Sequence, residues 1–287
     1  MRIVTDSAAN LTAQERDDWD VTVAPLTIQF PEEEIQSSAI TPDDFYQRLK
    51  AMKPEIPTTA LPSAGYFEEL FRNLSKDGEE ILAIHISSGL SGTLDSARLG
   101  AEGAGEADVV TFDSKTLSGG QRFQVLAASL ADRAGWGRAR ILERLRDIRE
   151  NTEVIYSLET LEYLERGGRI GRVQSLVSSL LNIKPVIHVD RSDGKYSTVG
   201  KARTLPRTLS LMAAHLEELF GSRSLWATVL HGQLDAQAQE LRSLLEDRLS
   251  LARAEIMRVT PVLGVHTGPG IVGAALVPMD LLSDLLP

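Results

Sequence analysis

Three hydroxyl- and glycine-rich segments of this sequence carry side chains that could hold an anion. The first contains Thr59, and the second, residues 87–93, contains Ser91. The third places His266 and Thr267 among glycines. Hydroxyl and imidazole groups donate hydrogen bonds without a permanent charge, and glycine lets the backbone approach a ligand closely. Together the three segments predict a site for a small anion held by largely neutral donors.

A local basic cluster interrupts an otherwise acidic chain. Residues 165–172 contain Arg169 and Arg172, and Arg203 follows within the next 31 positions. Such a cluster is either a solvated loop or a site for an anion or a protein partner. The sequence does not distinguish these readings, so a regulator or scaffold that binds another protein through this cluster stays open.

A second function class is a hydrolase or acyltransferase. Ser91 or Thr59 would be the nucleophile, His266 the base, and Asp6 or Asp113 the group that orients the imidazole. Residues 89–93, Gly-Leu-Ser-Gly-Thr, nearly form a nucleophile elbow, but the last glycine is misplaced by one position. The spacing therefore weakens this alternative without excluding it.

Cofactor and metal sites find little support in the sequence. Residues 268–273 satisfy G-x-G-x-x-G, but residues 271–276 are expected to form a strand, and only fourteen residues follow Gly273. A dinucleotide fingerprint should open a helix and be followed by an acidic residue about 20 positions later. There is no cysteine, and the five histidines are scattered without an H-x-x-x-H pair. We therefore expect no cofactor and no metal.

Composition narrows the function further. The chain has 287 residues, 43% hydrophobic and 24% charged, which is typical of a globular protein. Its net charge of −10 argues against a nucleic-acid partner, which usually requires a basic surface. The first residues contain no basic stretch followed by an apolar run, and no apolar run approaches the ~20 residues of a membrane span. These features predict a cytoplasmic location.

The elements that must position these side chains alternate between strands and helices. Short apolar runs alternate with amphipathic stretches, which is typical of α/β proteins. Residues 87–93 follow an expected strand and precede an expected helix, and such strand ends are where open α/β sheets bind ligands. A boundary at residue 153/154 would separate domains 1–153 and 154–287. The expected strands are 3–4, 23–28, 81–86, 108–112, 154–158, 186–189, 196–199, 225–230, 256–259 and 271–276, and the main expected helices are 64–74, 93–100, 141–149, 205–220 and 233–251.

The combination and order of these motifs resemble the DegV family, the fatty-acid-binding subunits of bacterial fatty acid kinases. Each segment is weakly specific alone, but together they span nearly the whole chain. The segments that carry the resemblance are residues 3–7, 23–28, 41–46, 62–63, 86–93, 113–114, 161–171, 184–185, 200–201 and 266–270.

The resemblance implies a Rossmann-like α/β/α N-terminal domain and a C-terminal α/β domain with a mixed, largely antiparallel sheet. It implies a long-chain fatty acid buried between the domains, with its carboxyl group bound by Thr59, Ser91, His266 and Thr267. Arg169, Arg172 and Arg203 match basic positions near the head group or the kinase interface. The protein would have no catalytic residues. It would present the carboxyl group to a separate ATP-dependent kinase subunit for acyl-phosphate formation in phospholipid metabolism, and would contact a membrane surface transiently for lipid exchange.

Two departures from the family pattern limit what the resemblance implies. Residues 30–40 lack the usual tyrosine-containing pattern, so the conformation of that segment is in doubt. Ala60 and Leu61 replace the usual serine and glutamine of a Thr-Ser-Gln-Pro-Ser motif, so polar contacts from that loop are in doubt. The sequence does not show which acyl chain length and saturation the site prefers, which kinase is the partner, or what the oligomeric state is. For His266 we expect a head-group ligand whose pKa an adjacent carboxylate would raise.

Overall fold

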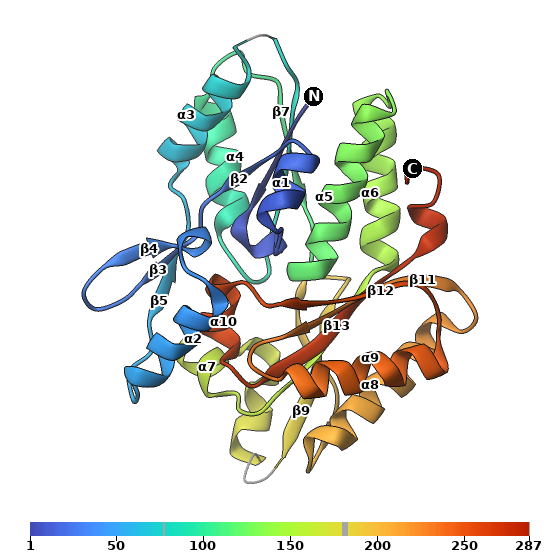
Figure 1. The fold of residues 1–287 in the computed structure, drawn as a ribbon. Coiled ribbons are helices and arrows are strands. Elements are labelled where there is room, and N and C mark those ends of the chain that lie inside the picture. The colour runs from blue at the N-terminus through green and yellow to red at the C-terminus, as the bar shows by residue number, and fades with distance from the viewer. Residues whose placement is uncertain (77, 180–182, 287) are drawn as a thin grey trace.

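The computed structural model describes residues 1–76, 78–179 and 183–286. The N-terminal half is built on a four-stranded parallel sheet (Figure 1). Its central strands are buried along nearly their whole length, as expected for a parallel sheet covered by helices on both faces. In sheet order the strands are β2 (Val21–Ala24), β1 (Arg2–Asp6), β6 (Ile81–His85) and β7 (Val109–Asp113).

Helices cover both faces of this parallel sheet. On one face lie α3 (Ala64–Leu74) and α4 (Thr93–Gly103), and on the other lie α5 (Ser118–Arg133) and α6 (Arg138–Asn151). Helix α3 buries Phe67 and Phe71, four positions apart, and the Ser63 hydroxyl accepts a hydrogen bond from the Tyr66 amide at its start. These features follow directly from the residue spacing.

The C-terminal half is built on a six-stranded mixed sheet. Neighbouring strands are antiparallel except for β11 and β12, which run parallel. The amphipathic helices α8 (Leu205–Phe220) and α9 (Asp235–Arg248) cover its outer face. In sheet order the strands are β10 (Lys195–Ala202), β9 (Lys184–Asp190), β8 (Glu153–Leu158), β13 (Ile271–Pro278), β11 (Ser224–His231) and β12 (Ser250–Arg258). The expected fold class is confirmed.

Helix α5 joins the two halves. It contacts β1 and β6 of the parallel sheet and β13 of the mixed sheet. A Cβ atom added at Gly119 would lie 2.6 Å from the Ala275 Cβ atom, so the start of α5 approaches the mixed sheet as closely as backbone allows. The division at residue 153/154 stays a prediction. The mixed sheet begins one residue earlier, with β8 at Glu153.

Smaller elements pack around α10. A three-stranded sheet and α2 pack near α10, which also contacts α7. No described helix is long and apolar enough to cross a membrane. The bounds are α1 (Ala13–Asp18), β3 (Thr27–Gln29), β4 (Glu34–Gln36), α2 (Pro42–Ala51), β5 (Thr58–Ala60), α7 (Glu162–Arg166) and α10 (Pro261–Thr267), with 3-10 turns at Ser7–Ala9, Ser37–Ala39, Gly171–Ser179 and Met279–Leu281.

Two expectations about local structure are wrong. The helix expected at 233–251 ends at Arg248, and β12 begins at Ser250, because residues 250–258 pair with β11 as the edge strand of the mixed sheet. His266 does not lie in a glycine-rich loop but in the last turn of α10. Pro261 starts that short helix, and Gly268, at φ 70°, ends it in the left-handed conformation that glycine tolerates.

Candidate functional site

A cavity lies where the loops after the parallel strands, the start of α5, the mixed sheet and α10 meet. Its walls are mainly apolar, and no described lining residue is acidic. The apolar lining residues are Leu26, Ile86, Leu90, Leu117, Val154, Ile155, Leu230, Val259, Val262, Leu263, Ile271 and Ala274.

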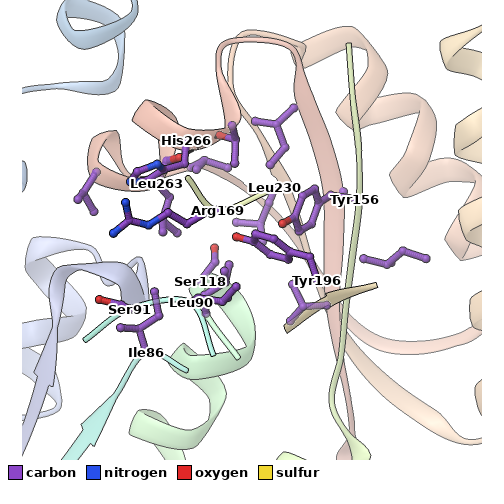
Figure 2. Close-up of a pocket in the computed structure, with 18 of the residues that line it drawn as sticks. Ile86, Leu90, Ser91, Ser118, Tyr156, Arg169, Tyr196, Leu230, Leu263 and His266 are labelled. Carbon is purple, nitrogen blue, oxygen red and sulfur yellow. Dashed lines mark hydrogen bonds between the residues drawn. The ribbon is translucent and has the colours of Figure 1, made fainter. Parts of the chain in front are cut away.

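The polar groups of the cavity are unevenly distributed. Figure 2 shows His266, Arg169 and Ser91 toward one end, whereas Tyr156 and Tyr196 stand on the mixed-sheet side. Thr59 on β5 joins the first group, because its Oγ1 atom lies 2.9 Å from the His266 Nε2 atom. The cavity therefore has one end rich in hydrogen-bonding groups, and the rest of its lining is apolar apart from the hydroxyl groups of Ser118, Tyr156 and Tyr196.

The imidazole of His266 is held neutral by its surroundings. Burial, and then the nearby positive charge of Arg169, lower the pKa of His266 from 6.5 to about 4. The Nδ1 atom is buried and has no hydrogen-bond partner among the described residues. A Cβ atom added at Gly167 would lie 2.3 Å from this Nδ1 atom, so the backbone of the segment after α7 seals that side of the ring. Of the two ring nitrogens, only Nε2, which now contacts Thr59, can exchange its hydrogen bond for one with a ligand.

Arg169 brings a positive charge to the polar end of the cavity. Its side chain is half-buried, and Nη1 donates a 2.7 Å hydrogen bond to the Gly167 carbonyl oxygen. No carboxylate within the described ranges forms an ion pair with it, in contrast to most arginines of this chain. A partly buried guanidinium without an acidic partner favours an anionic ligand.

Ser91 and Thr267 also line the cavity, with different hydrogen-bonding capacity. The Ser91 Oγ atom is 2.8 Å from the Thr93 Oγ1 atom, near the start of α4. The Thr267 hydroxyl donates to the Leu263 carbonyl oxygen at 3.1 Å, so its proton is used within α10. Ser91 can therefore turn its proton toward a ligand more readily than Thr267 can.

The other two arginines predicted from the basic cluster do not line the cavity. Arg172 is about half exposed and forms ion pairs with Asp193 at 2.8 Å and Asp190 at 3.6 Å. Arg203 is exposed after β10. The fold thus brings Thr59, Ser91, Arg169, His266 and Thr267 to one cavity and leaves Arg172 and Arg203 on the surface. The binding roles of all seven stay predictions.

The geometry of a Ser-His-Asp triad is not assembled. Asp6 accepts hydrogen bonds from the Ile86 amide and from His85, and Asp113 accepts them from Ser88. Neither carboxylate lines the cavity or forms a hydrogen bond with His266 among the described residues. Of the two predicted nucleophiles, Thr59 contacts the His266 imidazole at 2.9 Å, whereas the Ser91 hydroxyl pairs with Thr93. A triad needs the carboxylate to orient the imidazole and the imidazole to contact the nucleophile.

Three buried hydroxyl-bearing residues of the cavity were missed by sequence reasoning. Ser118 lies at the start of α5 with φ 50°, and its Oγ atom has no partner among the described residues. Tyr156 and Tyr196 form an edge-to-face pair with ring centroids 5.8 Å apart. Burial raises the pKa of Tyr156, and it raises that of Tyr196 to about 12. No sequence pattern identifies any of the three as a cavity residue.

Comparisons with known proteins agree with this architecture. A family model described as "Uncharacterised protein, DegV family" matches residues 1–279. A DegV domain-containing protein of Clostridium perfringens is 34% identical over 276 residues, which cover 96% of this chain and 97% of that protein. A DegV domain-containing protein of Deinococcus radiodurans is also 34% identical, over 260 residues covering 90% of each chain.

Solved structures match over almost the full length. One, named for fatty acid binding of a DegV family protein from Thermus thermophilus, has a TM-score of 0.90 and 30% identity, covering 97% of this chain and 100% of that one. A stearic acid-binding protein from Eubacterium ventriosum has a TM-score of 0.87 and 25% identity, covering 97% and 98%. Because the family model matches residues 1–279 and the Clostridium perfringens protein is 34% identical over 276 residues, this chain belongs to the DegV family.

Proposed function

We propose that this protein binds one long-chain fatty acid in the cavity between its two sheets. The carboxylate would lie against Arg169, His266, Thr59 and Ser91, and the acyl chain would follow the apolar walls. The observation that carries the proposal is the half-buried Arg169, without a described acidic partner, at the polar end of an apolar cavity. The names of the Thermus and Eubacterium proteins, which state fatty acid and stearic acid binding, support it.

The energetics of the cavity fit such a ligand. Burying a methylene group gains about 0.8 kcal/mol, so about 15 methylenes supply on the order of 12 kcal/mol before the costs of association. Affinity then depends mainly on the acyl chain. The head-group residues need only orient the carboxylate, and a ligand carboxylate beside the imidazole would raise the pKa of His266.

Equilibrium titration of the delipidated protein with stearic acid tests this assignment. Arg169→Gln removes a charge-assisted hydrogen bond worth about 1.5–3 kcal/mol, so it should raise the Kd roughly ten- to a hundredfold. Arg172→Gln is the matched control, because it removes the same charge three residues away, outside the cavity, and should leave the Kd unchanged. No measurable binding by the native protein, or equal binding by both variants, would contradict the proposal.

We further propose that the bound carboxyl group is presented to a separate ATP-dependent kinase subunit for acyl-phosphate formation, with no catalytic residue supplied by this chain. The exposed Arg172 and Arg203 would serve the kinase interface, and transient contact with a membrane surface would load or release the lipid. The two sheets would correspond to domains 1–153 and 154–287. Arg169 is the one permanently charged residue among the described residues that line the cavity, and Thr59, Ser91 and His266 are neutral. This supports the proposal, because a second cation would lower the reactivity of the carboxylate further.

Reconstitution with a fatty acid kinase subunit and ATP tests this second step. Charge reversal of Arg172 and Arg203 together should abolish acyl-phosphate formation while the protein retains its fatty acid. Loss of bound lipid in that variant would instead assign these arginines to the head-group site.

A further inference from the structure

A buried carboxylate flanked by two histidines lies outside the cavity, on the face of the mixed sheet that α8 covers. Glu153 is 1% exposed, and its Oε1 atom is 2.6 Å from the His188 Nδ1 atom and 3.6 Å from the His215 Nε2 atom. One ligand atom from each of the three residues can be chosen so that all lie within 4.8 Å of one another.

The fold forces these three residues together although they are far apart in sequence. His188 on β9 is paired with Ile155 on β8, and Glu153 is two residues before Ile155, so both side chains lie on the same face of the sheet. His215 comes from α8, which packs on β8 and β9. The spacing of these residues in the sequence does not predict the cluster, because it depends on the strand register and on how α8 packs on the sheet.

Two polar atoms of the cluster make no hydrogen bond. The Glu153 Oε2 and His215 Nε2 atoms are both buried without a hydrogen bond to any described residue. Each has only a longer contact of 3.6 Å, Oε2 with the Arg191 Nε atom and Nε2 with the Glu153 Oε1 atom. One carboxylate oxygen and one imidazole nitrogen can therefore turn to a metal ion without losing a hydrogen bond.

We propose that Glu153, His188 and His215 form a binding site for Zn²⁺. One carboxylate and two imidazoles are a known zinc donor set, with water completing a tetrahedral site. The two histidine side chains are 24% and 28% exposed, so solvent can supply the remaining ligand. Tetrahedral zinc places its ligand atoms about 3.4 Å apart, so shifts of about 1 Å suffice. The metal would replace the hydrogen bond between the His188 Nδ1 and Glu153 Oε1 atoms.

Arg191 is the group that opposes a cation here. Its Nε atom lies 3.6 Å from the Glu153 Oε2 atom, its side chain is one-third exposed, and Nη1 donates to the Glu150 carbonyl oxygen. The guanidinium can move toward solvent when the metal enters. Its positive charge still weakens binding, so Arg191→Gln should bind Zn²⁺ several-fold more tightly than the native protein. A site elsewhere on the chain would not respond in this way.

Isothermal titration of the chelator-treated full chain with Zn²⁺ tests the proposal. We expect one equivalent to bind and to raise the Tm, since the metal binds only the folded site. His188→Gln and His215→Gln should each weaken binding by at least about tenfold. His231→Gln is the matched control, because that buried histidine lies outside the cluster, 3.8 Å from Asp235, and should bind as the native protein does.

The result that would overturn the site is an absence of stoichiometric Zn²⁺ binding by the native protein, or binding unchanged in the His188→Gln and His215→Gln double variant. If either substitution reduces folding, the far-ultraviolet circular dichroism of the zinc-free variants identifies it. Arg191→Gln, which keeps all three ligands, then provides the independent measurement. An unchanged or lower affinity in Arg191→Gln also contradicts the proposal.

Discussion

His266 illustrates how burial sets the chemistry of a single residue in this site. Its pKa of about 4 means that the ring is neutral at pH 7 and protonates only in acid. Because the unfolded chain binds this proton below pH 6.5 and the folded chain resists it until about pH 4, native stability falls as the pH falls through that window. The shift corresponds to on the order of 3 kcal/mol between pH 7 and pH 4.

His266→Gln should remove this part of the acid sensitivity. The free energy of unfolding of the lipid-free protein, measured by urea denaturation at pH 7 and pH 4, should fall more for the native protein than for the variant. The comparison isolates His266, because His231, whose pKa burial also lowers, is present in both proteins. Equal losses in the two proteins would mean that His266 is not buried as described.

Ser91 is the hydroxyl whose removal should affect the ligand most clearly. Ser91→Ala deletes a donor worth about 1.5–3 kcal/mol to a charged group, so stearic acid should bind at least about tenfold more weakly. Ser63→Ala is the control: it deletes a hydroxyl that caps α3 outside the cavity, and should cost about 1 kcal/mol of stability without changing affinity. An unchanged Kd for Ser91→Ala would remove this residue from the head-group site.

Residue types alone predicted part of the site. Thr59, Ser91 and His266 lie in recognisable segments, and the structure brings them to one cavity. Arg169 and Arg172 could not be distinguished in sequence, because a three-residue shift along an irregular segment turns one inward and the other toward Asp193. Ser118 and Tyr196 face the cavity only through tertiary packing, which periodicity does not encode.

At the scale of elements, the sequence predicts the bounds of a helix correctly where its buried residues recur at helical spacing. Helices α3 and α8 have the expected bounds, 64–74 and 205–220, because their apolar residues repeat at helical spacing. Helix α5 was missed: its residues are buried on nearly all sides between the two sheets, so it lacks a polar face. Helix α10 was missed because its seven residues, about two turns, are too few to show a helical periodicity.

The contact between the α7 segment and α10 is tight enough to test by one added methyl group. Gly167→Ala would place a Cβ atom 2.3 Å from the His266 Nδ1 atom and 2.9 Å from the Tyr163 carbonyl oxygen. The imidazole must then move and release Thr59. We expect stearic acid binding to weaken about tenfold, or about 1.4 kcal/mol.

Gly137→Ala is the control for this prediction. No atom lies within 4 Å of a Cβ added at Gly137, which caps α6 with φ −70°. Its affinity and Tm should match those of the native protein. If Gly167→Ala binds stearic acid normally as well, the sealing of His266 by the segment after α7 is wrong.

At the scale of the whole molecule, neither half forms the cavity alone. Ile86, Ser91 and Leu117 come from the half with the parallel sheet, and Arg169 and His266 come from the half with the mixed sheet. Helix α5, packed against both sheets, fixes their relative position. A ligand between them contacts both halves and should therefore stabilise the whole chain against unfolding.

The central claim is that the cavity holds a fatty acid, and its most direct test is mass spectrometry of the lipid released when the freshly purified protein is denatured. The account predicts close to one long-chain fatty acid per chain, and a markedly reduced amount in Arg169→Gln. A protein that releases no fatty acid and hydrolyses model esters, with that activity lost in His266→Gln, would contradict it.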